Sequence, residues 1–231
     1  MLKPLRKLQQ SVAKRVYRSR PVARFLSGQF HRSYYYSGKS TWKDTHWFGA
    51  PLLKCPLDLW IYQEIFVTVK PDIIIECGTN RGGSACFMGS LCDLIGKGKI
   101  VTIDVVDIKK GHPTHPRATY LIGSSTSETI VRQVRDFVGD AETVLVVLDS
   151  DHSRDHVLKE LEAYAPLVTP GSYVIVEDSN INGNPIDPAS GPGPMEAIDA
   201  FLTGNDAFSI DSSREKFFIS FNPRGYLKRV R

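Results

Sequence analysis

Acidic residues directly follow two apolar stretches of this sequence. The stretch VLVVLDSDHS carries Asp149, Asp151 and His152 after a run of Val and Leu, and YVIVEDSN carries Glu177 and Asp178 after a second run. Two buried strands that each end on carboxylates can bring three acids around one point. Because Mg²⁺ prefers oxygen ligands and keeps positions open for water or substrate, the pattern predicts a metal site of Asp149, Glu177 and Asp178. An imidazole beside such a site can take a proton, which makes His152 the candidate general base.

Other interpretations of these residues stay open. Asp151 is close enough in the chain to replace Asp149 at the metal or to face solvent instead, and Asp149 is the favoured ligand. The acids can also cap helices or form a structural salt bridge, and His152 can have a structural role. His156 follows four residues later on a predicted helix, where packing or surface exposure is expected. The same oxygen ligands would also accept Mn²⁺.

A glycine-rich turn follows an earlier apolar run in IIIECGTNRGGSA. Gly78 lets the chain turn tightly under a ligand, while Gly82 and Gly83, followed by Ser84, leave room at the start of the next helix. The spacing is not GxGxxG, which disfavours a dinucleotide. Glu76 points the same way, since a carboxylate in this turn would repel a pyrophosphate but could hold an ammonium group.

Polar residues also end the two strands that follow this turn. Asp104 ends one strand, where an acid can accept hydrogen bonds from both ribose hydroxyls. Gly123, Ser124 and Ser125 end the other, where an adenine edge could lie. With Asp149 and the acid of the glycine turn, they describe a nucleoside ligand that is positively charged and has no phosphate. This fits S-adenosylmethionine better than NAD, although each residue alone also suits a turn or a cap.

Apolar runs and helical patterns must position these residues, and the two alternate along the chain. Strands are predicted over residues 72–77, 99–105, 119–122, 143–148 and 172–176, and helices over residues 56–69, 83–95, 128–138, 154–167 and 195–202. Strands rich in Val and Ile without alternation imply a parallel sheet covered by helices on both faces. The segments FSID and KFFISF should add an antiparallel edge, giving a doubly wound α/β fold of about seven strands. In such sheets ligands bind at the carboxyl ends of the strands.

Charge is unevenly distributed along the 231 residues. Eleven of the 29 Lys and Arg residues and none of the 25 acids lie in residues 1–43. A helical spacing of apolar residues among these basic residues predicts an arm, residues 1–41, ahead of a single domain, residues 42–231. The arm could lie on an anionic membrane through residues 1–30, or pack on the body or a partner subunit of a homo-oligomer. We expect no nucleic-acid partner, because the body is acidic and has no known nucleic-acid module. The apolar residues of the arm are Leu2, Leu5, Leu8, Val12 and Val16.

Several features favour a cytoplasmic protein, peripheral at the inner membrane surface if the arm binds lipid. No apolar stretch approaches the roughly 20 residues of a spanning helix. The four cysteines form no CxxC pair and mostly lie in apolar patterns typical of reduced, buried thiols. Residues 34–48 are rich in aromatic side chains and could cover an acceptor pocket, although a packing arm is the favoured interpretation. The cysteines are Cys55, Cys77, Cys86 and Cys92.

Six motifs resemble the bacterial rhamnosyl O-methyltransferase and cephalosporin hydroxylase family. They are DLWIYQEI, IIECGTNRGGSA, LDSDHS followed by HVL, VEDSNINGNP, GPGPMEAI and REKFFISFNPRGYL, spread over about four-fifths of the chain. The resemblance implies a Rossmann-like methyltransferase that uses S-adenosylmethionine and usually Mg²⁺. It also implies metal ligation by Asp149, Glu177 and Asp178, with His152 at the place of the general base. The sequence contains no His-x-Asp or His-x-Glu, the spacing typical of a non-haem iron oxygenase.

The resemblance implies a small-molecule or lipid-linked sugar as acceptor, such as a rhamnosyl unit on a glycolipid, glycan or natural product. Asn180, Asn182 and Asn184 could hydrogen-bond sugar hydroxyls, or could serve only the turn. A lipid-linked acceptor would also explain the basic arm. Two alternatives remain: a tailoring enzyme for a non-sugar antibiotic acceptor, and a non-catalytic scaffold that keeps the cofactor fold.

Overall fold

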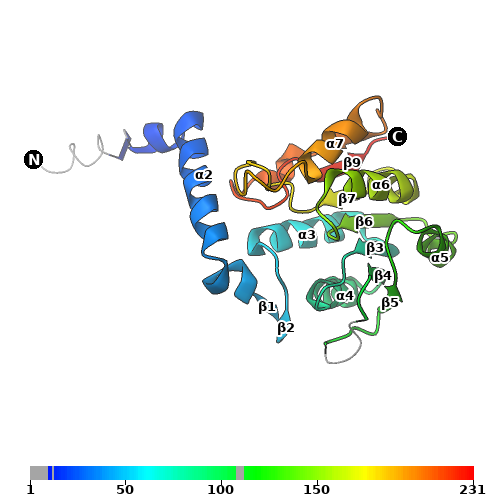
Figure 1. Cartoon of the computed structure of the whole chain (residues 1–231). Helices are drawn as coiled ribbons and strands as arrows, with labels where there is room; N and C mark the ends of the chain where they lie inside the picture. Colours follow the sequence, from blue (N-terminus) through cyan, green and yellow to red (C-terminus); the bar gives the residue numbers. More distant parts are fainter. Residues whose placement is uncertain (1–9, 12, 108–111) are drawn as a thin grey trace, which may run out of the picture.

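A seven-stranded sheet forms the centre of the computed structural model, which describes residues 10–11, 13–107 and 112–231 (Figure 1). The strand order is β5-β4-β3-β6-β7-β9-β8; β3 to β7 are parallel, and β9 pairs antiparallel with both β7 and β8. The strands are β3 (Ile73–Cys77), β4 (Lys99–Asp104), β5 (Ala118–Ile122), β6 (Val144–Leu148), β7 (Tyr173–Val176), β8 (Phe208–Ile210) and β9 (Tyr226–Arg229). The predicted doubly wound fold with an antiparallel edge is confirmed.

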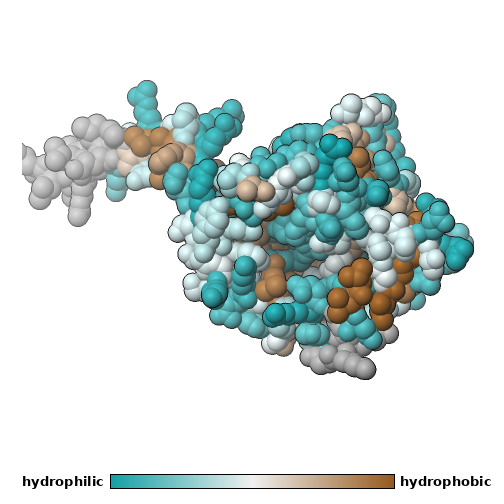
Figure 2. Space-filling model, viewed as in Figure 1, coloured by the Kyte–Doolittle hydropathy of each residue, from teal (hydrophilic) through white to brown (hydrophobic). Residues whose placement is uncertain are grey.

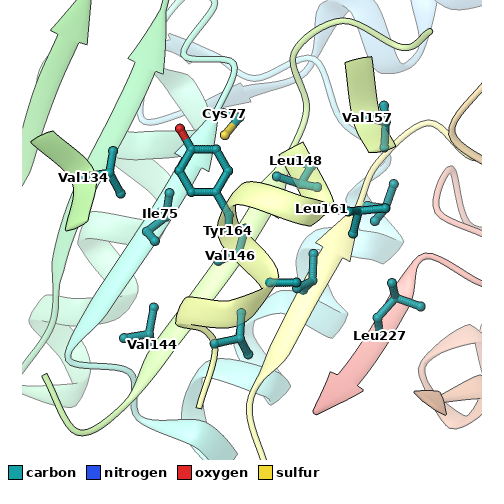
Figure 3. Packing of buried hydrophobic residues seen from close by; sticks show 14 of the residues in the cluster. Ile75, Cys77, Val134, Val144, Val146, Leu148, Val157, Leu161, Tyr164 and Leu227 are labelled. Atoms are coloured by element: carbon teal, nitrogen blue, oxygen red, sulfur yellow. The ribbon is translucent and has the colours of Figure 1, made fainter. Parts of the chain in front are cut away.

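Helices cover both faces of the sheet, and as a result every residue of the central strands β3, β6 and β7 is buried. One face packs against α3 (Pro56–Val69) and α4 (Gly83–Ile95), and the other against α5 (Glu128–Val138), α6 (Arg154–Tyr164) and α7 (Pro194–Leu202). Figure 3 shows the second of these cores, in which Tyr164 of α6 lies beside Val146 of β6 and Leu161 of α6 lies toward Val157. Pro56 begins α3, and the Ser127 hydroxyl caps α5 by accepting from the Ile130 N–H.

The N-terminal part of the described chain lies along the outside of this body (Figure 1). It consists of α2 (Arg20–Tyr36), in which only His31 is buried, two short turns η1 (Gly38–Ser40) and η2 (Trp42–Asp44), and the strand pair β1 (His46–Trp47) and β2 (Ala50–Pro51). Leu2, Leu5, Leu8 and Val12 of the predicted amphipathic pattern lie outside the described residues, and Val16 is exposed. The division of the chain at residue 41 stays a prediction.

The segment KFFISF is not a strand, and this part of the prediction was wrong. It follows the turn η4 (Ser212–Glu215), and the strand that pairs with β7 is β9, a few residues later. The physical reason is the buried Asp58 of α3, which accepts hydrogen bonds from the Ser220 hydroxyl at 2.7 Å and the Phe221 N–H at 2.8 Å. These bonds hold the segment against α3 in place of a sheet ladder.

Three further expectations concern the cysteines, a membrane-spanning helix and the helix predicted over residues 154–167. All four cysteines are buried free thiols, as their apolar surroundings predicted. None of the helices in the described residues combines the length and apolar character that a bilayer crossing requires. The short helix η3 (Ala165–Leu167) continues the turn after α6, so the predicted helix over residues 154–167 is present in two pieces.

Candidate active site

The two acidic stretches lie side by side because β6 and β7 are neighbouring parallel strands, with Leu148 paired to Val176. The chain is held immediately beyond both strands. The Asp149 N–H donates to the Cys77 carbonyl of β3 at 2.8 Å, and the Glu177 N–H donates to the Leu148 carbonyl at 2.9 Å. The carboxylates of residues 149 and 177 therefore start from backbone that the sheet itself fixes.

Asp149, His152 and Asp178 form one compact group. Each offers an atom that could bind a metal, and these atoms lie within 4.8 Å of one another. The His152 Nε2 atom is 3.3 Å from Asp149 Oδ1 and 3.4 Å from Asp178 Oδ2. Asp178 has a φ of +52°, a left-handed conformation that few residues adopt outside turns, and its N–H donates to Asn222 at 3.2 Å. The geometry brings together two of the three predicted acids and the predicted base.

Glu177 lies next to this group but bonds to other partners. Its Oε1 atom accepts from the Lys54 ammonium at 2.5 Å and from the Tyr62 hydroxyl. The same ammonium donates to Asp149 Oδ2 at 2.6 Å, so Lys54 joins the two carboxylates. The sequence prediction missed Lys54 and Tyr62. The available signal was a lysine inside the apolar stretch PLLKCPL, which is unusual unless its charge is paired.

Burial and close charges shift the pKa values of this cluster in different directions. Burial lowers the pKa of His152, but the hydrogen bond to Asp149 and the charge of Asp178 outweigh it and raise that pKa to about 9. Burial, together with Asp149, raises the pKa of Glu177 to about 8. The pKa of Asp149 is lowered despite its burial, because Lys54 and His152 stabilise its charge. Without a bound cation, His152 and Glu177 therefore both carry a proton around neutral pH.

Asp151 stands apart from the group. Its Oδ1 atom accepts from the Ser153 N–H at 2.8 Å at the start of α6, and its side chain is exposed. Of the two alternatives, Asp149 is therefore the residue placed among the other acids.

A cavity of about 900 Å³ joins this group to the ends of the other strands. Its wall includes Gly78, Asp104, Gly123, Ser124, Ser125, Asp149, His152 and Asp178. These residues lie at the carboxyl ends of β3, β4, β5, β6 and β7, so this part of the predicted cofactor and metal residues shares one space at the carboxyl edge of the sheet. The predicted metal ligand Glu177 is not on its wall. Asp104 bridges the loops there, because its two oxygens accept from the N–H groups of Asn80 at 2.8 Å and Val106 at 3.0 Å.

The remaining predicted cofactor residues lie under the glycine-rich turn and not on the cavity wall. Glu76 is fully buried and accepts from the Thr102 hydroxyl at 2.6 Å. Its Oε1 atom has no hydrogen-bond partner among the described residues. Gly82 has a φ of +77° just ahead of α4, and a Cβ atom at Gly83 would lie 2.0 Å from the Pro51 carbonyl oxygen. Position 83 must therefore be glycine for the turn to pack against Pro51.

His156 lines the cavity, contrary to the expectation that it only packs or faces solvent. Its Nε2 atom is 3.1 Å from the Ser125 hydroxyl and 3.3 Å from the buried Glu160, which also accepts from the Ser150 hydroxyl at 2.6 Å. This polar network fixes the loops after β5 and β6. No local pattern in the sequence indicates Glu160, which lies on α6 and reaches both loops only in the folded chain.

The N-terminal segment supplies an aromatic wall. Tyr35 and Trp42 line the main cavity, and their rings stack with centroids 5.2 Å apart. A second cavity of about 640 Å³ shares Tyr35, His152 and Ile181 with the first and extends to Gly191 and Pro192. Residues 34–48 therefore contribute to the wall of the cavity, the alternative offered for them, and they also pack on the body, because both rings contact Phe221.

The three loop asparagines do not line either of these cavities. The amide of Asn180 is buried against His31 of α2 at 3.0 Å, Asn182 donates to Glu196 at 3.0 Å, and Asn184 donates to the Ile181 carbonyl at 3.0 Å. Their side chains therefore hold the loop together, which supports the alternative that these amides serve the turn.

Comparisons with known proteins agree with this geometry. The family model described as Rhamnosyl O-methyltransferase/CmcI matches residues 39–230. A curated rhamnosyl O-methyltransferase of Mycobacterium leprae is 36% identical, over 88% of this chain and 90% of its own length. Two solved structures share the fold. The CmcI-N160 apo-structure has a TM-score of 0.65 and 22% identity, and the match covers 82% of this chain and 77% of that chain. The structure named cmcI-D160 Mg-SAM has a TM-score of 0.63 and 22% identity, and the match covers 82% of this chain and 78% of that chain. The chain therefore belongs to the rhamnosyl O-methyltransferase/CmcI family, as its motifs predicted, and is an enzyme of the O-methyltransferase class.

Proposed function

We propose that this protein transfers a methyl group from S-adenosylmethionine to a sugar hydroxyl, with Mg²⁺ held beside the acceptor. One observation carries the proposal: two carboxylates and an imidazole converge on the wall of a cavity that also holds the candidate nucleoside contacts. The acceptor class is supported by the relatives, which are named rhamnosyl O-methyltransferases. The cofactors are supported by the Mg and SAM in the name of a structure with the same fold.

The donor atoms fit a hard divalent cation. Asp149 Oδ1 and Asp178 Oδ2 are carboxylate oxygens that approach one point, and Glu177 has a second oxygen beyond the one that Lys54 and Tyr62 occupy. We assign these three acids as the ligands, and Mn²⁺ would suit the same oxygens. When bound, the ion supplies a Lewis acid that lowers the pKa of an acceptor hydroxyl.

The nucleoside contacts follow from the strand ends. We assign the ribose to Asp104, the adenine to the loop of Gly123, Ser124 and Ser125, and the space beside the sulfonium to Gly78 and Asp149. The unpartnered oxygen of Glu76 is a buried acceptor that suits the ammonium group, directly or through water. Gly82, Gly83 and Ser84 shape the turn that carries these groups.

His152 is the general base in this proposal. Asp149 and Asp178 hold its Nε2 atom between them, on the wall shared by both cavities. The imidazole must be neutral to accept the acceptor proton, and the two acids alone raise its pKa to about 9. Positive charge bound at those acids opposes the imidazolium and lowers this pKa. His152 is thus ready to accept a proton only when the site is loaded.

The aromatic wall favours a sugar acceptor. Tyr35 and Trp42 offer flat apolar surface with polar edges, which suits the C–H face of a sugar ring beside His152. The second cavity gives the remainder of a glycan, or a lipid-linked aglycone, a path to solvent.

The direct test is the mass of the product. Incubation with S-adenosylmethionine and a rhamnosyl glycolipid should add one methyl group to the sugar. Chelation of divalent ions with EDTA should abolish the transfer, and added Mg²⁺ should restore it. Transfer that is unaffected by EDTA, or that occurs only on non-sugar acceptors, would contradict the proposal.

Divalent-ion affinity should depend on pH. The pKa values of about 8 for Glu177 and about 9 for His152 mean that both groups hold protons at neutral pH, and cation binding must displace at least one of them. Affinity should therefore weaken as the pH falls below 8, by up to about tenfold per pH unit for one displaced proton. Calorimetric titration with Mg²⁺ in two buffers of different ionisation enthalpy measures both the affinity and the proton release. Equal affinity at pH 6 and pH 8.5 would contradict this prediction.

We further propose that residues 1–30 bring the enzyme to the cytoplasmic face of the inner membrane, where a lipid-linked acceptor would lie. Tyr17, Phe25 and Phe30 are exposed apolar residues, and the same part of the molecule shows teal hydrophilic residues beside brown hydrophobic ones (Figure 2). The basic residues of this segment are Lys3, Arg6, Lys7, Lys14, Arg15, Arg18, Arg20 and Arg24. Basic amphipathic segments of this kind bind anionic lipid surfaces.

Removal of residues 1–19 should weaken binding to anionic vesicles. The cut leaves α2 and its buried His31 in place, so the body keeps its contact with Asn180. Co-sedimentation with phosphatidylglycerol vesicles measures the effect, and neutral phosphatidylcholine vesicles are the control. Equal sedimentation of the full and shortened chains would refute the membrane proposal and leave the methyl-transfer proposal untouched.

A further inference from the structure

Lys54 is a buried cation within the candidate metal site to which the methyl-transfer proposal gives no role. It is only 5% exposed, yet it belongs to no helix or strand. Its ammonium group bonds to Asp149 Oδ2 at 2.6 Å and to Glu177 Oε1 at 2.5 Å. Burying an ammonium costs several kcal/mol unless its partners are well placed, so such an arrangement requires tight local geometry.

The chain around Lys54 holds the ammonium in this position. Leu52 is buried in the core beside α3 and α4, and its N–H donates to the Thr45 carbonyl at 2.9 Å. Pro51 lies directly against Gly83, because a Cβ atom added at Gly83 would be 2.0 Å from the carbonyl oxygen of Pro51. The segment before α3 is thus packed onto the glycine-rich turn, and Lys54 projects from a fixed backbone.

The two oxygens of Asp149 have different partners. Oδ2 bonds to Lys54, while Oδ1 faces His152 at 3.3 Å and belongs to the group that could hold a metal. For Glu177, both recorded bonds among the described residues go to Oε1, from Lys54 and from Tyr62. The ammonium group therefore bonds to Oδ2 of Asp149 and Oε1 of Glu177, and it does not bond to Oδ1 or Oε2.

We propose that Lys54 is a positioning residue that orients Asp149 and Glu177 for the divalent ion by holding the oxygen of each that the ion does not use. This inference rests on the proposed metal dependence. Partners behind the ligands commonly set ligand orientation in metal sites, and their loss lowers metal affinity by about 10- to 100-fold. Lys54 also balances part of the negative charge that three neighbouring acids would otherwise bury together.

The same contacts allow a competing role with the opposite sign. A lysine that only neutralises the acids would compete with a divalent cation, so that its removal would relieve repulsion and strengthen cation binding. A lysine that positions the acids would weaken cation binding when removed. The direction of the change in affinity therefore decides between the two roles.

The experiment measures Mn²⁺ binding to the full chain by electron paramagnetic resonance and calorimetry. Lys54→Met keeps the length of the side chain and removes the ammonium, and we expect Mn²⁺ affinity to fall about 10- to 100-fold. Lys54→Gln retains an amide donor and should lose less. The matched control is Lys216→Met, which removes a lysine paired with Glu64 at 2.6 Å on the surface. This control should bind Mn²⁺ as the wild type does.

Metal binding, circular dichroism and S-adenosylhomocysteine binding together separate the possible outcomes. Mn²⁺ binding by Lys54→Met that is equal to or tighter than wild type overturns the inference. If circular dichroism shows that Lys54→Met does not fold, Lys54→Gln decides by the same criterion. Binding of S-adenosylhomocysteine should be largely retained in both variants, because the proposed ribose and adenine contacts, Asp104 and the loop of Gly123, lie at the ends of β4 and β5, and only Asp149 among the proposed cofactor contacts bonds to Lys54. Retained binding distinguishes positioning from general loss of structure. Failure of the wild type to bind Mn²⁺ or Mg²⁺ would count against the proposed function itself.

Discussion

Replacing His152 by alanine is expected to reduce methyl-transfer turnover by about two to four orders of magnitude, the range typical of a lost general base. The reason is geometric. The Nε2 atom lies between Asp149 and Asp178 on the shared wall of the two cavities, and the other described histidine on the main cavity wall near this point, His156, is engaged with Ser125 and Glu160. Affinity for S-adenosylmethionine should be nearly unchanged, because the proposed nucleoside contacts lie at the ends of β3, β4 and β5.

Single-turnover kinetics and calorimetry with S-adenosylmethionine measure these two quantities separately. His46→Ala is the matched control, because His46 lies exposed in β1 with Asp44 3.9 Å away and does not line the main cavity. It should leave turnover at the wild-type level. Unchanged turnover in His152→Ala would remove His152 from the mechanism, whereas loss of cofactor binding would indicate a structural role.

The fold and much of the site could be predicted because they depend on local pattern. Apolar runs without alternation identified strands buried on both faces, and parallel strands bring their carboxyl ends to one edge. Asp149 and Asp178 could therefore be expected to meet, although the chain separates them by a helix and a strand. Gly78 was identified in the same way, from a turn that follows a strand. Each of these predictions needs only the sequence near one strand and the rule for where parallel strands end.

The parts that could not be predicted depend on contacts between distant segments. Lys54 is 95 residues from Asp149 and 123 from Glu177, and its neighbours in sequence carry no pattern that points to either. The segment around Phe221 alternates like a strand, but its backbone bonds to Asp58, 163 residues away. A buried charge takes its partners from the folded chain, so local propensity cannot assign them.

Gly78→Ala is expected to lower turnover by at least about 100-fold, because a shift of about 1 Å at a reacting centre can cost this much. Gly78 has a φ of +99°, and a Cβ atom there would lie 1.8 Å from the carbonyl oxygen and 2.5 Å from the carbonyl carbon of Asp149. Relief of this overlap must move the end of β3 or the end of β6. Either movement displaces Asp149 relative to Asp178, so Mn²⁺ affinity should fall together with turnover.

Gly171→Ala separates this overlap from the cost of the backbone conformation. Gly171 has a φ of +88°, close to that of Gly78, but a Cβ atom there would meet nothing within 4 Å. Both variants should lose about 1–3 kcal/mol of unfolding free energy from the left-handed conformation, as measured by urea denaturation. Only Gly78→Ala should also lose Mn²⁺ binding and turnover, since only there does the added methyl group meet the backbone of a proposed ligand. Equal loss of metal binding in both variants would show that stability, and not the placement of Asp149, limits the site.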